Sequence, residues 1–138
     1  MSDLDNLYSD LSYYRRRRNQ YQSEQSAVRQ KIQRLNNTKS SVAGIKSRVS
    51  DAKSYIGNKM ETHRDTWAGE NQKAVNAIHT DEINRGYERY YDDVDAVLDA
   101  ICDEITRLEN ENRHLGFLLN SVVNSINSIY NEIEKLTN

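Results

Sequence analysis

Apolar side chains recur along this chain in alternating steps of three and four residues, and this spacing limits the possible folds more than any other feature. In the first half, every seventh position carries an apolar or aromatic residue: Leu7, Tyr14, Tyr21, Val28, Leu35, Val42, Val49 and Ile56. A period of 3.5 residues puts one continuous stripe on a helix, as in a coiled coil. A strand would need alternation of period two, which neither half shows.

The second half repeats the stripe through a series richer in Ile, Leu and Val. Its members are Tyr87, Tyr90, Val94, Val97, Ile101, Ile105, Leu108, Leu115, Leu119, Val122, Ile126, Ile129, Ile133 and Leu136. Asn112 takes a seam position within this series, where a buried amide can fix the register of two helices at some cost in stability. We therefore expect an all-α fold, a long antiparallel helical hairpin of coiled-coil type.

The composition agrees with slender helices rather than a thick core. Only 36% of the residues are hydrophobic, 29% are charged, and the mean hydropathy is -0.92. The chain has no proline, whereas proteins average about 5%, which disfavours turn-rich all-β folds. Disorder would leave the apolar residues aperiodic, and here they are periodic.

Charge is distributed unevenly between the two halves. Residues 1–66 hold 13 Lys and Arg against 7 Asp and Glu, a net charge of +6, whereas residues 67–138 hold 6 against 14, a net charge of -8. Helices of opposite sign attract when they fold back on each other, so the asymmetry supports antiparallel pairing.

We expect one helical-hairpin domain over residues 1–138, with a first rod over about 2–62, a tip over about 63–86 and a second rod over about 87–137. Trp67-Ala68-Gly69 lies in the tip and holds the one Trp of the chain. The Trp67 ring can close the end of the stripe, and Gly69 lets the backbone turn. We predict a short helix from about Trp67 and a break or kink between about residue 79 and Gly86.

The sequence offers no convincing catalytic, cofactor or metal site. Cys102 is the one cysteine, and Glu111-x-x-His114 is a single copy of a motif that di-iron bundles need twice. Asp95, Asp99 and Asp103 could hold a hard cation, but a solvated acidic flank explains them better. The run Arg15–Arg18 points all round a helix, so we expect no nucleic-acid binding.

The hairpin resembles a known family at several places. The Leu4-x-x-Leu7-Tyr8-x-x-Leu11 rhythm, Trp67-Ala68-Gly69 at the turn and the Tyr90-Tyr91 pair beyond it fit the WXG-type superfamily exported by type VII secretion systems. The chain is most similar to its YwqH-like proteins, the partners of LXG toxins in Gram-positive bacteria. The resemblance implies a non-enzymatic targeting and chaperone partner that binds the N-terminal helical domain of an LXG-type toxin. It also implies presentation to the secretion ATPase, with other small helical partners allowed in the complex.

The same resemblance directs attention to Tyr-x-x-x-Asp/Glu motifs, which act as export signals in type VII substrates. Tyr130-Asn-Glu-Ile-Glu134 fits in sequence and place, and one helical turn joins the two side chains into one patch. A second match, Tyr91 to Asp95, lies further inside the chain.

We expect partner helices to pack on an apolar stripe at the end of the hairpin opposite the tip. Its predicted members are Leu4, Leu7, Leu11, Leu115, Leu118, Leu119, Val122 and Ile126. The alternative is a self-assembling coiled-coil scaffold with no secretion role, and the same heptads also allow a homodimer. We find no basic leader and no apolar run of about 18 residues, so we expect synthesis in the cytoplasm without membrane insertion, and export, if any, together with the partner.

Overall fold

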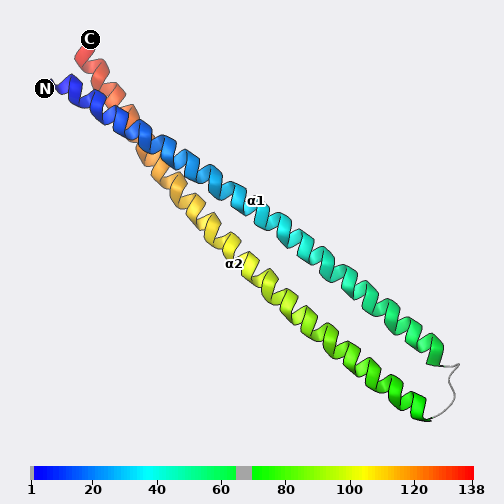
Figure 1. The fold of residues 1–138 in the computed structure, drawn as a ribbon. Helices are drawn as coiled ribbons and strands as arrows, with labels where there is room; N and C mark the ends of the chain where they lie inside the picture. The colour runs from blue at the N-terminus through cyan, green and yellow to red at the C-terminus, as the bar shows by residue number, and fades with distance from the viewer. Residues whose placement is uncertain (1, 65–69) are drawn as a thin grey trace. The chain divides into compact units, whose positions relative to one another are not determined.

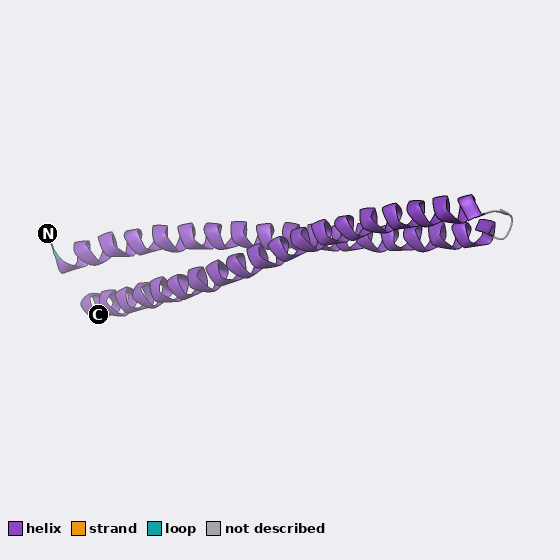
Figure 2. Cartoon of the chain, turned by 90° about the horizontal axis from the view of Figure 1, so that it is seen from below, coloured by secondary structure: helices purple, strands orange, loops and turns teal. Residues whose placement is uncertain are grey.

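The protein folds into two long helices. The computed structural model describes the backbone of residues 2–64 and 70–138 and the side chains of residues 2–58 and 79–138. Helix α1 spans Asp3–Arg64 and helix α2 spans Glu70–Thr137 (Figure 1). Nearly all of the described chain is therefore helix, as Figure 2 shows. The all-α prediction is confirmed, while the predicted turn residues Trp67 and Gly69 lie outside the described residues.

Helix α1 begins with a side-chain cap. The Ser2 Oγ accepts a hydrogen bond from the Asp5 backbone N–H at 3.2 Å, which satisfies one of the donors that a helix start leaves free. Asp3 and Asp5 place negative charge in the first turn, where the helix dipole favours it. At the other end of the chain, the Thr137 hydroxyl donates to the Ile133 carbonyl at 2.9 Å, and Lys135 stands in the last turn of α2.

The break expected between residues 79 and 86 is absent. Helix α2 begins at Glu70, and not near residue 87, and it continues through Gly86 without interruption. A single glycine inside a helix costs only about 1 kcal/mol relative to alanine, which neighbouring helical turns can offset. A sequence without proline has no stronger signal to stop the helix there.

The chain divides into two compact units, each formed by one stretch of α1 and one stretch of α2. Unit 1 comprises residues 1–35 and 104–138, and unit 2 comprises residues 36–103. Within each unit the two stretches pack side by side and run in opposite directions (Figure 1). The expected antiparallel pairing therefore holds inside both units.

Unit 1 has a well-buried core in two clusters. Leu11 of α1 packs with Val122, Ile126 and Ile129 of α2. Val28 packs with Leu108 and Leu115, and Leu108 is only 2% exposed. The Tyr21 side chain packs against both clusters and joins them. These contacts follow the predicted 3.5-residue period, so the seam of unit 1 is closed by the chain itself.

Unit 2 is sealed much less tightly. Among its described side chains only Ile101 is buried. The α1 seam of this unit includes the half-buried Lys46 and Lys53 beside Val42 and Val49. Lys46 forms an ion pair with Asp95 at 2.5 Å. In unit 1 the same series of seam positions holds Leu4, Leu11 and Ile32, together with the half-buried Arg18 and Gln25.

Candidate partner-binding surfaces

The predicted partner-binding stripe lies wholly in unit 1, and half of it is buried there. Leu11, Leu115, Val122 and Ile126 belong to the core between α1 and α2. The remaining members are half-buried: Leu4, Leu7, Leu118 and Leu119. A side chain enclosed by its own helix pair offers almost no area to a second protein while the pair is closed. This placement moves the search for a docking surface away from the seam of unit 1.

The predicted export motif is exposed on the last turns of α2. Tyr130 and Glu134 both face solvent, one helical turn apart. Arg15 of α1 donates a hydrogen bond to the Tyr130 hydroxyl, and its guanidinium lies 5.5 Å from the centre of the Tyr130 ring. Such cation–π contacts contribute about 0.5–1 kcal/mol at exposed sites. The motif is therefore presented against a basic side chain from the opposite helix.

The second copy of the motif, Tyr91 and Asp95, lies in unit 2 and is contacted by two lysines of α1. Asp95 is paired with Lys46, and the Lys46 Nζ also lies 5.8 Å from the centre of the Tyr91 ring. Lys53 Nζ lies 5.9 Å from the same ring and 5.8 Å from that of Tyr87. The Tyr91 hydroxyl is buried and has no hydrogen-bond partner among the described residues. These lysines thus pack over aromatic rings instead of closing an aliphatic seam.

Asn112 occupies a half-buried seam position in unit 1, as its spacing predicts. Its Oδ1 atom is buried and accepts no hydrogen bond within the described residues. A buried oxygen without a donor costs about 1–3 kcal/mol, so Asn112 lowers the stability of the closed pair.

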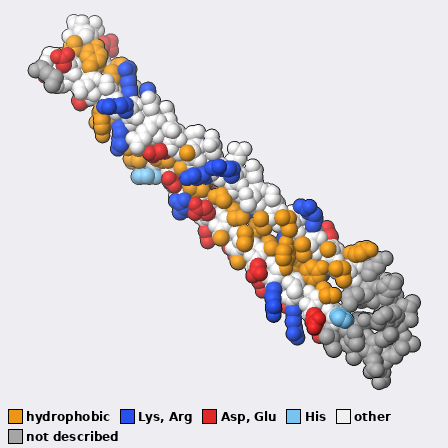
Figure 3. Space-filling view, in the orientation of Figure 1, with side chains coloured by type: hydrophobic (Ala, Val, Ile, Leu, Met, Phe, Trp, Pro, Cys, Tyr) orange, Lys and Arg blue, Asp and Glu red, His pale blue; other side chains and the backbone are white. Residues whose placement is uncertain are grey.

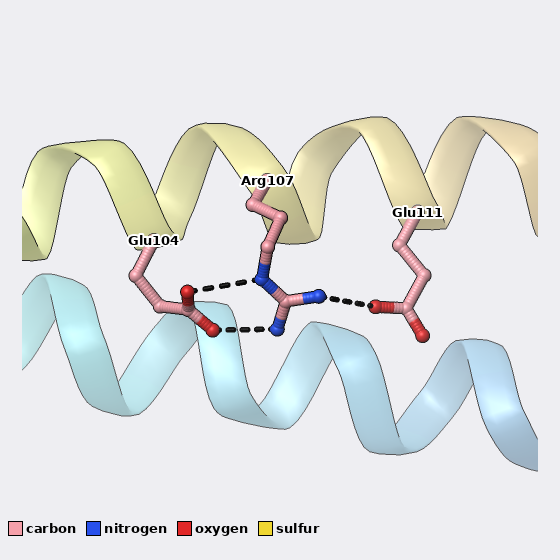
Figure 4. A network of polar contacts seen from close by, with 3 residues as sticks. All are labelled: Glu104, Arg107 and Glu111. Atoms are coloured by element: carbon pink, nitrogen blue, oxygen red, sulfur yellow. Dashed lines mark hydrogen bonds and ion pairs between the residues drawn. The ribbon is translucent and has the colours of Figure 1, made fainter.

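Figure 4 shows a polar network on the α2 surface of unit 1. The Arg107 guanidinium donates to Glu104 at 2.6 and 3.0 Å and to Glu111 at 3.4 Å. The hydrogen bonds from Arg107, helped by the positive charges of Arg107 and Lys31, lower the pKa of the Glu104 carboxyl. The bond to Glu104 raises the pKa of Arg107 in turn. Lys31 belongs to α1, so the Glu104 carboxyl feels positive charge from both helices.

Several large hydrophobic side chains are exposed that the periodicity did not select as partner-binding. Phe117 is 74% exposed and Tyr55 is 63% exposed. In unit 2, Ile45, Ile56 and Val97 also reach the surface. Figure 3 shows hydrophobic side chains gathered over both helices in that unit. Ile56 and Val97 belong to the predicted stripes, so the period identified them as apolar positions without showing that they stay exposed.

Metal clusters and membrane spans are absent among the described residues. No three His, Cys, Asp or Glu side chains come together there as a metal site would need. No described stretch of helix has the length and apolar character to cross a bilayer. Of the arginine run, Arg17 packs against Tyr21, 5.2 Å from the ring centre, and bonds to Gln20 at 3.3 Å.

Comparison with known protein families gives a match over most of the chain. A family model described as YwqH-like matches residues 12–131, which is most of both helices. No curated protein and no solved structure matches the chain.

Proposed function

Because the chain belongs to the YwqH-like family, we propose that it is a non-enzymatic targeting and chaperone partner of an LXG-type toxin. It binds the N-terminal helical domain of the toxin in the cytoplasm and keeps that domain soluble. It then helps to present the complex to the ATPase of a type VII secretion system, and it can leave the cell with its partner.

The observation that carries this proposal is the surface left by the two-helix fold. Each helix of a pair buries one stripe, and side chains outside the stripe stay in contact with water. Here these include large hydrophobic residues, Phe117 in unit 1 and Tyr55 in unit 2. Exposed apolar side chains on a slender helix pair are what a third helix from another protein can cover.

Co-expression with the N-terminal domain of an LXG-type toxin from the same genome tests the proposal. We expect a stable complex that co-purifies and elutes as one species in size-exclusion chromatography. The rival scaffold function predicts instead that the lone chain forms a stable homodimer or larger assembly and ignores the toxin domain. Absence of any complex, with the toxin domain folded and soluble alone, contradicts the chaperone role.

Export is tested separately through the Tyr130 and Glu134 motif. We expect Tyr130→Ala combined with Glu134→Ala to reduce secretion of the complex strongly, because the proposed recognition patch loses its ring and its carboxylate together. Immunoblotting of culture supernatant against cell lysate measures the effect. The matched control is Tyr91→Ala with Asp95→Ala. Unchanged secretion of the Tyr130 and Glu134 variant removes the signal but leaves the binding proposal intact.

A further inference from the structure

The seam of unit 1 consists of two rows of side chains, and the first row is apolar or aromatic throughout. On α1 this row holds Leu7, Tyr14, Tyr21 and Val28, and on α2 it holds Leu108, Leu115, Val122 and Ile129. If one helix slid along the other by one heptad, each apolar contact in this row would be replaced by another. The first row therefore closes the helix pair without fixing its register.

The second row of the seam is mixed. It holds Leu4, Leu11, Arg18, Gln25 and Ile32 on α1, and Ile105, Asn112, Leu119, Ile126 and Ile133 on α2. In an antiparallel pair, the numbers of facing residues add up to a constant. Leu11 packs among Val122, Ile126 and Ile129, so its level is that of Ile126. Two heptads further along α1 and two heptads back along α2, Gln25 stands at the level of Asn112.

A glycine next to this level gives the Gln25 amide its space. The Gln25 Nε2 atom would lie 3.5 Å from a Cβ added to Gly116, which is one helical turn beyond Asn112. The Gln25 side chain therefore reaches across the seam to α2. One heptad to either side, the position of Gly116 is taken by Glu109 and Val123, whose side chains would fill the same space. Only the observed register brings Gln25 to the glycine.

A slip of one heptad would separate Gln25 from Asn112. The new facing pairs would be Gln25–Leu119 with Ile32–Asn112 in one direction, and Gln25–Ile105 with Arg18–Asn112 in the other. In both directions the half-buried Gln25 amide would face an aliphatic side chain, which offers it no hydrogen bond. The observed register is the one that brings the two amides to the same level.

From this arrangement we infer that the amide layer, which is Gln25 and Asn112 with the space beside Gly116, fixes the register in which α1 and α2 pair in unit 1. A polar residue in the seam of a coiled coil can specify register at some cost in stability. The Asn112 Oδ1 atom is buried and has no donor among the described residues, which is such a cost. The inference concerns the chain alone and holds whatever partner the protein binds.

The register also determines which residue of α2 meets Arg15. Arg15 donates a hydrogen bond to the Tyr130 hydroxyl, and its guanidinium lies 5.5 Å from the centre of the Tyr130 ring. A slip of one heptad moves α1 by about 10 Å along α2, at about 1.5 Å per residue, and so separates the two side chains. By fixing the register, the amide layer keeps Arg15 on Tyr130.

Exchanging two residues of α1 tests the layer in the full chain without changing the composition. Gln25→Ile combined with Ile32→Gln moves the α1 amide by one heptad, so it can face Asn112 and reach Gly116 only if α1 slips by one heptad. The slip is measured by electron–electron double resonance between spin labels on Ser12→Cys and Asn110→Cys, two exposed positions of unit 1, with Cys102→Ala in every protein. We expect the exchange to lengthen the distance between the labels by about 10 Å.

Two matched variants control the experiment. Adding Asn112→Ile and Ile105→Asn to the exchange moves the α2 amide by one heptad as well, which makes the two amides face each other in the original register. This fourfold variant should therefore return to the distance of the parent. Val28→Leu with Leu35→Val exchanges two residues of the apolar row and should leave the distance unchanged. Circular dichroism reports the helix content of each protein.

The outcomes separate as follows. A longer distance in the exchange variant alone supports the inference. The parent distance in the exchange variant overturns it, because the register is then set by other residues. A longer distance in both the exchange and the fourfold variant overturns it as well, because the effect then does not depend on the facing amide. If the exchange variant loses its helix, the fourfold variant decides. Recovered helix with the parent distance supports the layer, and continued loss overturns it.

Discussion

Units 1 and 2 share the same two helices and the same 3.5-residue period, yet they place their hydrophobic side chains differently. Unit 1 fills its seam with buried residues such as Leu108 and Val28. Unit 2 has the half-buried Lys46 and Lys53 in its seam, and Val97, a residue of the predicted stripe, is 49% exposed. Unit 1 therefore buries its seam more completely than unit 2, although both units also expose large hydrophobic side chains.

The comparison shows that a heptad period alone does not tell whether a helix pair is self-sufficient. Whether a helix pair is self-sufficient also depends on whether apolar residues lie beside the seam, since closing the seam does not bury them. A narrow stripe can be buried by one partner helix, but a widened stripe needs at least two. The two units of one chain thus differ in how completely the same period is buried.

The largest expected effect is the loss of a core side chain from unit 1. Leu108→Ala should lower the free energy of unfolding by about 2–5 kcal/mol, because it leaves a cavity around a fully buried leucine. Leu98→Ala in unit 2 removes the same atoms from a half-buried seam position and should cost clearly less. Urea unfolding followed by circular dichroism gives both values. Equal losses would break the distinction between the two units.

Removing the buried carbonyl oxygen of Asn112 should stabilise unit 1 further. Asn112→Leu is expected to raise the free energy of unfolding by roughly 1–3 kcal/mol, because the buried Oδ1 atom has no donor among the described residues. Asn110→Leu, at an exposed position on the same helix, should change it little. Chemical denaturation compares the two variants. A destabilised Asn112→Leu protein would show that the amide is satisfied in solution.

Giving unit 2 an aliphatic seam should make it resemble unit 1. Lys53→Leu is expected to stabilise the chain by about 1 kcal/mol, since half-burial of a leucine outweighs the lost contacts with Tyr87 and Tyr91. Hydrogen exchange should show the added protection within unit 2. Ser54→Leu, which adds the same side chain outside the seam, serves as the control. If both variants gain equally, the seam position has no special role.

The smallest expected effect concerns the titration of Glu104. Its hydrogen bonds from Arg107 lower the pKa of the carboxyl in the folded chain. A lowered folded-state pKa means that this contribution to stability is present above the unfolded-state pKa and is lost as the pH falls through the folded-state pKa. Carbon-detected NMR should show Glu104 titrating below the usual range for glutamate, and Arg107→Gln should move it upward. An unchanged titration in that variant would assign the shift to another group.

The regular spacing of the sequence is enough to predict the two helices, their antiparallel pairing and most of the seam. Near residue 97 the prediction is wrong, because Val97 of the predicted stripe is 49% exposed and the adjacent Leu98 is half-buried instead. Leu11, Leu108 and Ile126 fall in the core where the period puts them, because a long periodic stripe has one way to be buried. The same spacing identifies the seam position of Asn112, whose carbonyl oxygen is buried.

Two other features could not be obtained from spacing. The expected break near Gly86 is missing, because a lone glycine weakens a helix without ending it. The predicted partner stripe included Leu115 and Val122, which the chain buries itself. The spacing of apolar residues predicts which side chains are buried. It does not predict whether the helix that buries them belongs to the same chain or to another one.

The division into units also bears on the order in which the chain can assemble during synthesis. The two stretches that form unit 1 are separated by all of residues 36–103, so Leu11 and Val28 emerge long before the aliphatic residues that enclose them. At roughly 5–20 residues per second, a ribosome leaves these side chains uncovered for several seconds. The unit with the better-buried core is therefore the last to close, and the nascent N-terminal helix is open to helices of other chains until then.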